Sequence, residues 1–415
     1  MFGVGRTRRM SRYGLGSRGA LLVYAGLVAC FLTATDFLYA RRFISPVQPM
    51  STGSTGLVNR MAWYREHLND YNLVFVGDSR TYCGMHPELI DPLLNTSSIN
   101  LALFENWFLT QLPQIQELAP LVPKEATVVW SVGMENFVAT PGVRRVYPVG
   151  ILNALHYLEW SLPSDGLVDN VLYYNPVLHF LAVRGDARQD FVELLDHPLH
   201  MQGAKILGDA LIGTANAAEP ERPTAPSVPQ VSDEDLRTLT EQWQKDPRVA
   251  SVSVVRDNGR PTSLTIYFRR GSYYRVELDP EFFREKQRHF APYTSQPPRV
   301  EEGYWRVFEE ILRTFKNNKV NLIVNEVEEA PFVYGGQRTR EVWRKVMRDV
   351  VERRVLDFGF PYTRVSLDKL SNDDYFDYNH LNSSGAAIFT PMLAEQLRPY
   401  VHPYQAPRPA TAAMR

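Results

Sequence analysis

Short apolar runs alternate with helix-length segments along this chain, and this alternation constrains the fold more than any other feature. Three such runs come early, at 72–76, 98–103 and 126–132, and segments of helical length separate them. Short runs rich in apolar and β-branched residues are typical of strands buried on both faces of a sheet. Strand, helix and strand at this spacing predict an α/β fold with a doubly wound, mainly parallel sheet.

The same pattern resumes near the C-terminus. Aromatic and aliphatic residues recur at helical spacing in 304–315, and a strand at 320–324 follows. A second helix at about 338–358, a last strand at 362–367 and a terminal helix from about 383 complete the pattern. We therefore expect one domain built from two parts of the chain. These parts are 71–213, whose later half reads as helical and aromatic, and 301–400.

Residues between these two parts have a different character. The segment 214–231 is rich in proline and is interpreted as a linker. A capping-box pattern at Ser232 starts a helix, and the Asn258-Gly259 dipeptide predicts a tight hairpin turn between two alternating strands. One further strand follows at 274–278. We expect 232–300 to form a small antiparallel insertion with helices, serving as a lid or a partner-binding module.

An apolar segment at 19–40 contains one charged residue, Asp36. At 1.5 Å per residue it is long enough to cross a bilayer core of roughly 30 Å. Five arginines in 1–18 precede it, which predicts that this end is a cytoplasmic tail and that the rest is exported.

A cleaved signal peptide is the alternative interpretation of this segment. Its apolar core would span about 7–15 residues and end in a small-x-small cleavage site, which the longer 19–40 segment lacks. We therefore expect an uncleaved transmembrane anchor in a bacterial inner membrane, with the C-terminal domain on the periplasmic side. The turn-rich segment 41–70 is expected to be a stalk, and 401–415 a flexible tail.

Charge and cysteine content exclude several classes of function. The formal net charge is −1, so a basic face for nucleic acid is not expected. The two cysteines, Cys30 and Cys83, lie in contexts that do not suit a disulfide. His197 and His200 have a spacing seen in metal sites, but Pro198 lies between them and no acidic partners accompany them. We expect no metal and no cofactor.

Ser79 is the candidate nucleophile. It follows the first predicted strand in Gly77-Asp78-Ser79, and open α/β sheets bind ligands beyond the carboxyl ends of their strands. An ordinary turn between a strand and a helix also needs small polar residues, so the motif alone does not decide. Cys83 is a weaker candidate, because no other feature singles it out.

A serine hydroxyl needs a neighbouring base, and imidazole oriented by a carboxylate serves that purpose. Asp377 and His380 lie three residues apart in a polar loop beyond the last strand and supply both groups. Asp373 and Asp374 compete with Asp377 for the orienting role. In the alternative interpretation, Asp377 simply caps the terminal helix.

Two blocks of this sequence resemble the SGNH (GDSL-type) hydrolase superfamily. The first is Gly77-Asp78-Ser79, and the last is the run DYNHLNSSG at 377–385. The resemblance covers roughly 71–140 and 303–398 and implies an SGNH-like three-layer fold. It further implies Ser79 as nucleophile with Asp377 and His380 as its partners.

The resemblance also implies donors for an oxyanion. The third-block asparagine corresponds to Asn136 in Gly133-Met-Glu-Asn136, one residue longer than the usual spacing. The second-block glycine has no equivalent in 100–106. Asn106 or a backbone amide would have to replace it.

An anchored, exported domain of this kind is similar to the branch that contains the alginate O-acetylation and teichoic-acid D-alanylation proteins. That similarity implies extracytoplasmic acyl transfer, as an O-acetyltransferase or acetylesterase, on a cell-envelope or exported polysaccharide. A multi-span membrane acyltransferase is the partner it implies. Two alternatives stay open: a non-catalytic scaffold of a polysaccharide modification or export complex, and a general SGNH esterase.

Overall fold

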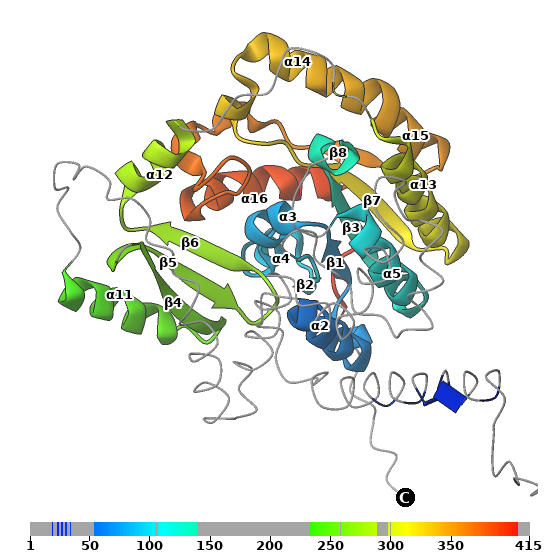
Figure 1. Ribbon diagram of the computed structural model, residues 1–415, viewed down its shortest axis with the longest axis horizontal. Coiled ribbons are helices and arrows are strands. Elements are labelled where there is room, and N and C mark those ends of the chain that lie inside the picture. Colours follow the sequence, from blue (N-terminus) through cyan, green and yellow to red (C-terminus); the bar gives the residue numbers. More distant parts are fainter. Residues whose placement is uncertain are drawn as a thin grey trace, which may run out of the picture.

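A five-stranded parallel sheet forms the centre of the protein, in the computed structural model shown in Figure 1. The structure describes residues 54–103, 107–138, 232–257, 259–288, 298 and 300–405, and isolated positions between 19 and 34. The strand order is β2-β1-β3-β7-β8, and every neighbouring pair is parallel. The bounds are β1 Leu73–Val76, β2 Ser98–Asn100, β3 Thr127–Val132, β7 Asn321–Glu326 and β8 Tyr362–Arg364. The predicted α/β fold with a mainly parallel sheet is thus confirmed.

The order of the strands places a ligand-binding position at the centre of the sheet. The chain runs from β1 outward to β2 on one side and then returns to β3 on the other side. The connections therefore diverge between β1 and β3, and the crevice beyond the carboxyl ends of such strands is where open α/β sheets bind ligands. Ser79 follows β1 directly, so it lies at this crevice.

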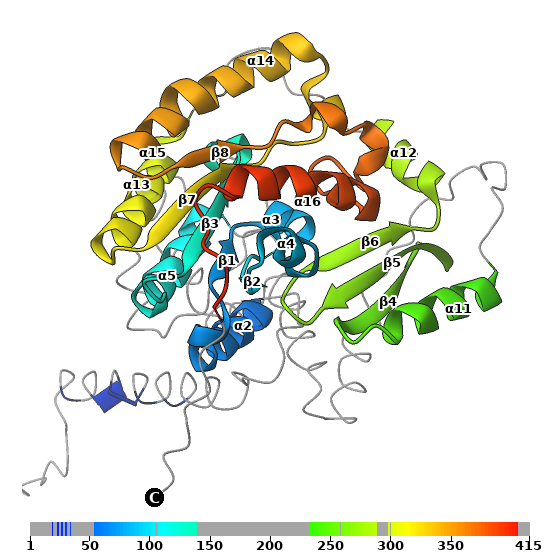
Figure 2. The same cartoon turned by 180° about the vertical axis from the view of Figure 1, so that it is seen from behind.

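Helices cover both faces of the sheet, which gives three layers (Figures 1 and 2). Successive residues of β1 point to opposite faces, so Val74 and Val76 belong to one core and Leu73 and Phe75 to the other. The first face carries α2 Ser54–Glu66, α5 Phe108–Leu118, α13 Glu302–Asn317, α14 Gln337–Val346 and α15 Arg353–Asp357. The second carries α4 Pro87–Leu94 and α16 Ser383–Leu397. A π-helical segment, Met347–Glu352, joins α14 to α15 within the single helix predicted there.

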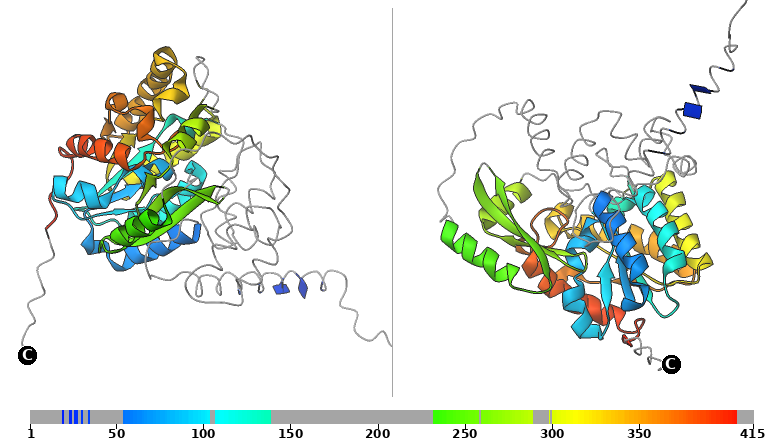
Figure 3. Two further views of the ribbon diagram at one scale, coloured as in Figure 1. Left: turned by 90° about the vertical axis from the view of Figure 1, so that its left-hand side faces the viewer. Right: turned by 90° about the horizontal axis from the view of Figure 1, so that it is seen from below.

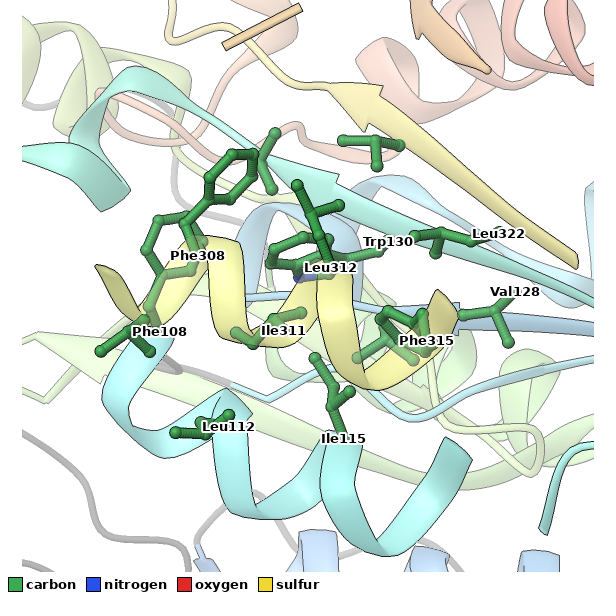
Figure 4. Packing of buried hydrophobic residues seen from close by; sticks show 14 of the residues in the cluster. Phe108, Leu112, Ile115, Val128, Trp130, Phe308, Ile311, Leu312, Phe315 and Leu322 are labelled. Carbon is green, nitrogen blue, oxygen red and sulfur yellow. The ribbon is translucent and has the colours of Figure 1, made fainter. Parts of the chain in front are cut away.

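Aromatic side chains fill the first core. Trp130 of β3 stacks on Phe308 of α13 at 5.4 Å between ring centres, and Phe108 of α5 lies 5.7 Å from each of them. Figure 4 shows α5 and α13 side by side over this tryptophan. The helical spacing of apolar residues in 304–315 is therefore explained by packing against the sheet.

Residues 232–288 form the second, smaller sheet that the sequence predicts. Its antiparallel order is β4-β5-β6, with strands β4 Val249–Asp257, β5 Arg260–Phe268 and β6 Tyr273–Glu277. Helix α11 Asp233–Gln244 precedes it and α12 Pro280–Arg288 follows it. Figure 3 shows this small sheet alongside the main domain. Its strand β6 contacts α16 and the short helix α3 Ser79–Gly84.

The small sheet is fastened to the edge of the main sheet. The amide of Asn100 in β2 donates to the Arg270 carbonyl at 2.9 Å, and Arg60 of α2 donates to the carbonyls of Gly271 and Ala102. Gly271 has a φ of +88°, and a Cβ there would lie 2.2 Å from the Asn100 carbonyl oxygen. Only glycine therefore fits at this contact, and the insertion is docked on the main domain through its backbone.

Several predicted segments lie outside the described residues. They are the tail 1–18, most of the anchor at 19–40, the linker 214–231, the helical stretch 141–213 and most of 401–415. Within the part of the chain that is described, none of the helices combines the length and the apolar character that crossing a bilayer requires. Helix α2 covers much of the predicted stalk, and its Met61 and Tyr64 are buried in the first core.

Candidate active site

Ser79 is the first residue of a short helix, α3 Ser79–Gly84, that begins where β1 ends. Gly77 makes the turn, and a Cβ there would lie 2.3 Å from the Thr81 hydroxyl oxygen, so a larger residue does not fit. The Asp78 carboxylate caps the helix by accepting from the Arg80 amide at 3.0 Å. These local contacts hold the Ser79 side chain at the carboxyl edge of the sheet, where 9% of the residue remains exposed.

Asp377 and His380 form a hydrogen-bonded pair in the loop before α16. The distance from His380 Nδ1 to Asp377 Oδ2 is 2.7 Å. The other oxygen, Asp377 Oδ1, accepts from the amides of Asn379 and His380 at 3.0 and 2.9 Å. The carboxylate therefore fixes both the imidazole and the backbone that carries it.

The structure decides between the carboxylates that compete for this role. Asp374 accepts from Ser371 and Ser384, and Asp373 pairs with Arg284 of the insertion. Asn382, with its side chain on the Gly385 amide at 2.9 Å, caps α16, so Asp377 is not the capping residue. Asp377 is thus the residue that orients His380.

The ionisation state of Asp377 suits this role. Burial raises its pKa, but the charge of His380 and the hydrogen bonds from the imidazole and the two amides outweigh burial. The pKa of Asp377 therefore lies below its ordinary value, and the group is a carboxylate at neutral pH. A carboxylate on Nδ1 leaves Nε2 as the atom that accepts a proton from a nucleophile.

Packing brings α3 and the Asp377–His380 loop to the same edge of the sheet. A Cβ at Gly84 would be 3.5 Å from the Leu381 side chain, and Phe376 shares a buried cluster with Tyr82 and Cys83. The hydrogen bonds among the described residues include none between the Ser79 hydroxyl and the imidazole. Such bonds are frequently long in enzymes without substrate and tighten in the complex.

Cys83, the rival nucleophile, faces the interior. The residue is almost fully buried, and burial raises the pKa of its thiol well above the ordinary value. A buried, protonated thiol is a poor nucleophile. Ser79 is therefore the better placed of the two.

Asn136 lies in a 3-10 turn, Met134–Phe137, directly after β3. Its side-chain oxygen accepts from the Gly133 amide at 2.8 Å and from Arg80 at 2.9 Å, and its Nδ2 donates to Asp78 at 3.1 Å. An amide nitrogen carries two hydrogens, so one remains for another acceptor. Asn136 is thus placed beside the Ser79 turn and is largely committed to holding it.

The second-block region is partly described. Asn106 lies outside the described residues. Asn100 is structural, because its Nδ2 donates to the carbonyls of Thr81 and Met85 at 2.9 and 2.8 Å. Its side-chain oxygen accepts from the Ala102 amide at 3.0 Å, which occupies one backbone donor of this region.

A buried charge cluster surrounds Arg80, and the sequence did not reveal it. Arg80 pairs with Asp78, with Glu329 at 3.0 Å and with Glu135 at 3.9 Å, and its side chain is 3% exposed. The three acids follow β1, β3 and β7, which are neighbours in the sheet but far apart in sequence. The sequence signal for this cluster is an acidic residue just beyond the carboxyl end of each of three strands, because the carboxyl ends of parallel strands lie at the same edge of a sheet.

One cation among three buried carboxylates leaves excess negative charge. Burial raises the pKa of Glu135 to about 7 and also raises the pKa of Glu329. For Asp78, burial likewise raises the pKa, but the charge and hydrogen bonds of Arg80 outweigh it and lower the pKa overall. The cluster therefore takes up a proton near neutral pH, and Glu135 and Glu329 are the groups whose neutral forms are favoured.

The titration of Glu135 predicts a pH-dependent stability. Its pKa rises from 4.5 to about 7 on folding, so the folded chain binds more protons between these values and loses stability as the pH rises through them. Glu135→Gln removes this loss. Urea unfolding measures this effect. Between pH 5 and 8, the free energy of unfolding of the variant relative to the wild type should increase by on the order of 1–3 kcal/mol. The exposed Glu125→Gln is the control, and a gain independent of pH would contradict the prediction.

The insertion also contacts the Asp377–His380 loop. Glu277 of β6 accepts from Asn382 at 3.1 Å, and Gln287 of α12 donates to the carbonyls of Asn372 and Tyr375. These contacts lie on either side of the pair. The insertion therefore packs against the loop that carries the Asp377–His380 pair.

Comparisons with known proteins assign no family and no function to this site. No protein-family model matches the chain, and a search of curated proteins finds no significant match. Within the described ranges, no three His, Cys, Asp or Glu side chains are grouped as ligands of a metal ion; His197 and His200 lie outside those ranges.

Proposed function

We propose that this chain is a serine-dependent acyl-transfer enzyme of the SGNH type. The observation that carries the proposal is the Asp377–His380 pair, with 2.7 Å between carboxylate and imidazole, at the sheet edge where Ser79 begins α3. The three-layer order of helices and sheet and the two sequence blocks support the same family.

The reaction follows from the roles of these groups. His380 Nε2 accepts the Ser79 proton while the hydroxyl oxygen attacks the acyl carbonyl, and Asp377 stabilises the resulting imidazolium. The tetrahedral intermediate then breaks its bond to the leaving alcohol, which takes the proton from the imidazolium. An acyl-Ser79 remains. Water as the next acceptor makes the enzyme an esterase, and a sugar hydroxyl makes it a transferase.

The oxyanion of each tetrahedral intermediate needs donors. The Ser79 amide and the second Nδ2 hydrogen of Asn136 are the candidates on described residues, with Asn106 as a third from the sequence. Each such donor lowers the barrier by roughly 3–4 kcal/mol. Holding Asn136 against Asp78 and Arg80 fixes one donor before substrate binds.

We further propose that the substrate is an O-acylated cell-envelope or exported polysaccharide. The apolar segment 19–40 with its preceding arginines supports a single-pass anchor with the domain on the periplasmic side. The resemblance to the alginate O-acetylation and teichoic-acid D-alanylation branch supports acyl exchange on such a polymer. A multi-span membrane acyltransferase would supply the acyl group.

Covalent labelling tests the nucleophile. A fluorescent phosphonate should modify the full-length protein, and peptide mass spectrometry should place the adduct on Ser79. An activated serine reacts, whereas an ordinary hydroxyl does not. Labelling should vanish in Ser79→Ala and persist in Ser366→Ala, which removes an exposed serine elsewhere on the domain.

A non-catalytic scaffold is the second candidate. The observation that favours it is the commitment of Asn136 to Asp78, Arg80 and the Gly133 amide. If the protein is a scaffold, the phosphonate should leave Ser79 unmodified. The heat-denatured protein is the negative control, and its Ser79 should also stay unmodified. Equal labelling of the wild type and Ser79→Ala would also contradict the enzymatic proposal.

A further inference from the structure

Arg275 of β6 reaches from the insertion toward the candidate catalytic pair. Its guanidinium carbon lies 4.4 Å from the ring centre of Phe376, and the Phe376 ring stacks on the His380 imidazole at 5.3 Å and 11°. Because the two distances meet at one ring centre, 4.4 Å and 5.3 Å allow at most 9.7 Å between guanidinium and imidazole.

Arg275 has no ion-pair partner within the described part of the chain; its charge acts on Glu277 only at longer range, where it opposes the rise in pKa that burial causes. It forms no salt bridge there, and its buried Nε–H has no acceptor. Two other arginines of the insertion do form ion pairs, Arg270 with Asp91 and Arg284 with Asp373. A buried donor without an acceptor is destabilising, so a charged side chain in this position requires an explanation.

The carboxylates nearest in sequence and in the site are engaged elsewhere. Glu277, two residues along the same strand, accepts from Asn382, and Asp377 holds His380 and two amides. The Arg275 side chain is partly exposed. It therefore offers an accessible guanidinium whose flat face is supported by Phe376.

We propose that Arg275 forms a subsite for an anionic group of the substrate, a carboxylate or a phosphate, beside the acyl group that reacts. This inference rests on the proposed function. Guanidinium groups bind both anions through paired hydrogen bonds. Because the guanidinium and the imidazole lie at most 9.7 Å apart, the anionic group and the reacting ester must bind close to each other. The two groups therefore lie on one sugar unit or on neighbouring units.

Substrate pairs test the subsite. The full-length protein is assayed with O-acetylated methyl glucoside, methyl glucuronoside and methyl glucoside 6-phosphate. We expect kcat/KM for at least one anionic ester to exceed that for the neutral ester by 10-fold or more, and the preferred anion identifies carboxylate or phosphate. Arg275→Met should reduce this ratio by about 10–100-fold, and Arg275→Lys should restore part of it.

Arg256→Met is the matched control. It removes an exposed arginine from β4 of the same small sheet, and its ratio should equal that of the wild type. Thermal melting of each variant monitors the fold. Arg275→Lys keeps the charge and the stem, so it tests the forked geometry even where the methionine variant fails to fold.

The two proposals fail in different ways. Ser79-dependent hydrolysis with the same substrate ratio in the wild type and Arg275→Met would overturn the subsite and leave the proposed function intact. If no ester is hydrolysed through Ser79, the proposed function fails. The subsite is then tested by measuring how tightly an anionic sugar binds. In Ser79→Ala, methyl glucuronoside or methyl glucoside 6-phosphate should then bind at least 10-fold more weakly after Arg275→Met; equal binding would overturn the inference.

Discussion

Ser79→Ala is expected to lower kcat/KM for hydrolysis of a small acetyl ester by about 10⁴- to 10⁶-fold. Alanine removes the oxygen that forms the acyl-enzyme, and no neighbouring group replaces it, because the Cys83 thiol is buried and protonated. The remaining rate would come from binding and oxyanion donors alone. Steady-state assays with 4-nitrophenyl acetate measure the loss.

The rest of the triad should behave as one unit with Ser79. His380→Ala should lower the rate to a similar extent, and the double variant should be no slower than either single variant, because each removes the same step. Asp377→Asn should cost about 10⁴-fold, since an amide favours the wrong imidazole tautomer. Activity of Ser79→Ala equal to that of the Ser366→Ala control would eliminate Ser79 as the nucleophile.

Arg80→Met is expected to lower the free energy of unfolding by about 3–5 kcal/mol at pH 7. Methionine leaves Asp78, Glu135 and Glu329 buried together without a cation. Urea unfolding followed by circular dichroism measures the loss. The cost arises mainly from the uncompensated carboxylates, and the original ion pairs contribute less.

The control for this substitution is Arg313→Met on α13. Arg313 pairs with Glu309 and Glu310, but 46% of its side chain is exposed. Exposed pairs contribute about 0–1 kcal/mol, so the control should stay close to the wild type. The loss of unfolding free energy in Arg80→Met should be smaller at lower pH. Glu135 and Glu329 are then protonated and neutral, because burial raises the pKa of both groups. A loss no larger than that of Arg313→Met would show that Arg80 does not neutralise the cluster.

Features that depend on neighbouring residues were predicted correctly. The strand at Leu73–Val76 and the turn at Gly77 follow from an apolar run and turn chemistry within one stretch. The short helix that begins at Ser79 was not predicted, because its six residues show no apolar periodicity. The hairpin of the insertion follows from Asn258-Gly259 and the alternation around it. Helix α14 ends in a π-helical segment that the even spacing of apolar residues did not indicate.

The resemblance of the 377–385 block implied Asp377, but residue type and position in the loop alone did not distinguish it from its acidic neighbours. Asp373, Asp374 and Asp377 are all acids of one loop, and only their hydrogen bonds show that Asp377 holds His380. The role of Asn136 likewise depends on Arg80 and Asp78, which reach it from another strand end.

Sequence patterns were enough to predict the parallel α/β sheet, the inserted antiparallel hairpin and the candidate residues Ser79 and His380. Each of these follows from hydrophobic periodicity or motif spacing, which are local properties. The Arg80 cluster and the position of Arg275 could be recognised in the folded chain alone, because both join strand ends or loops that are far apart in the sequence. Strand order and burial set those distances and the resulting pKa shifts, and no local pattern encodes them.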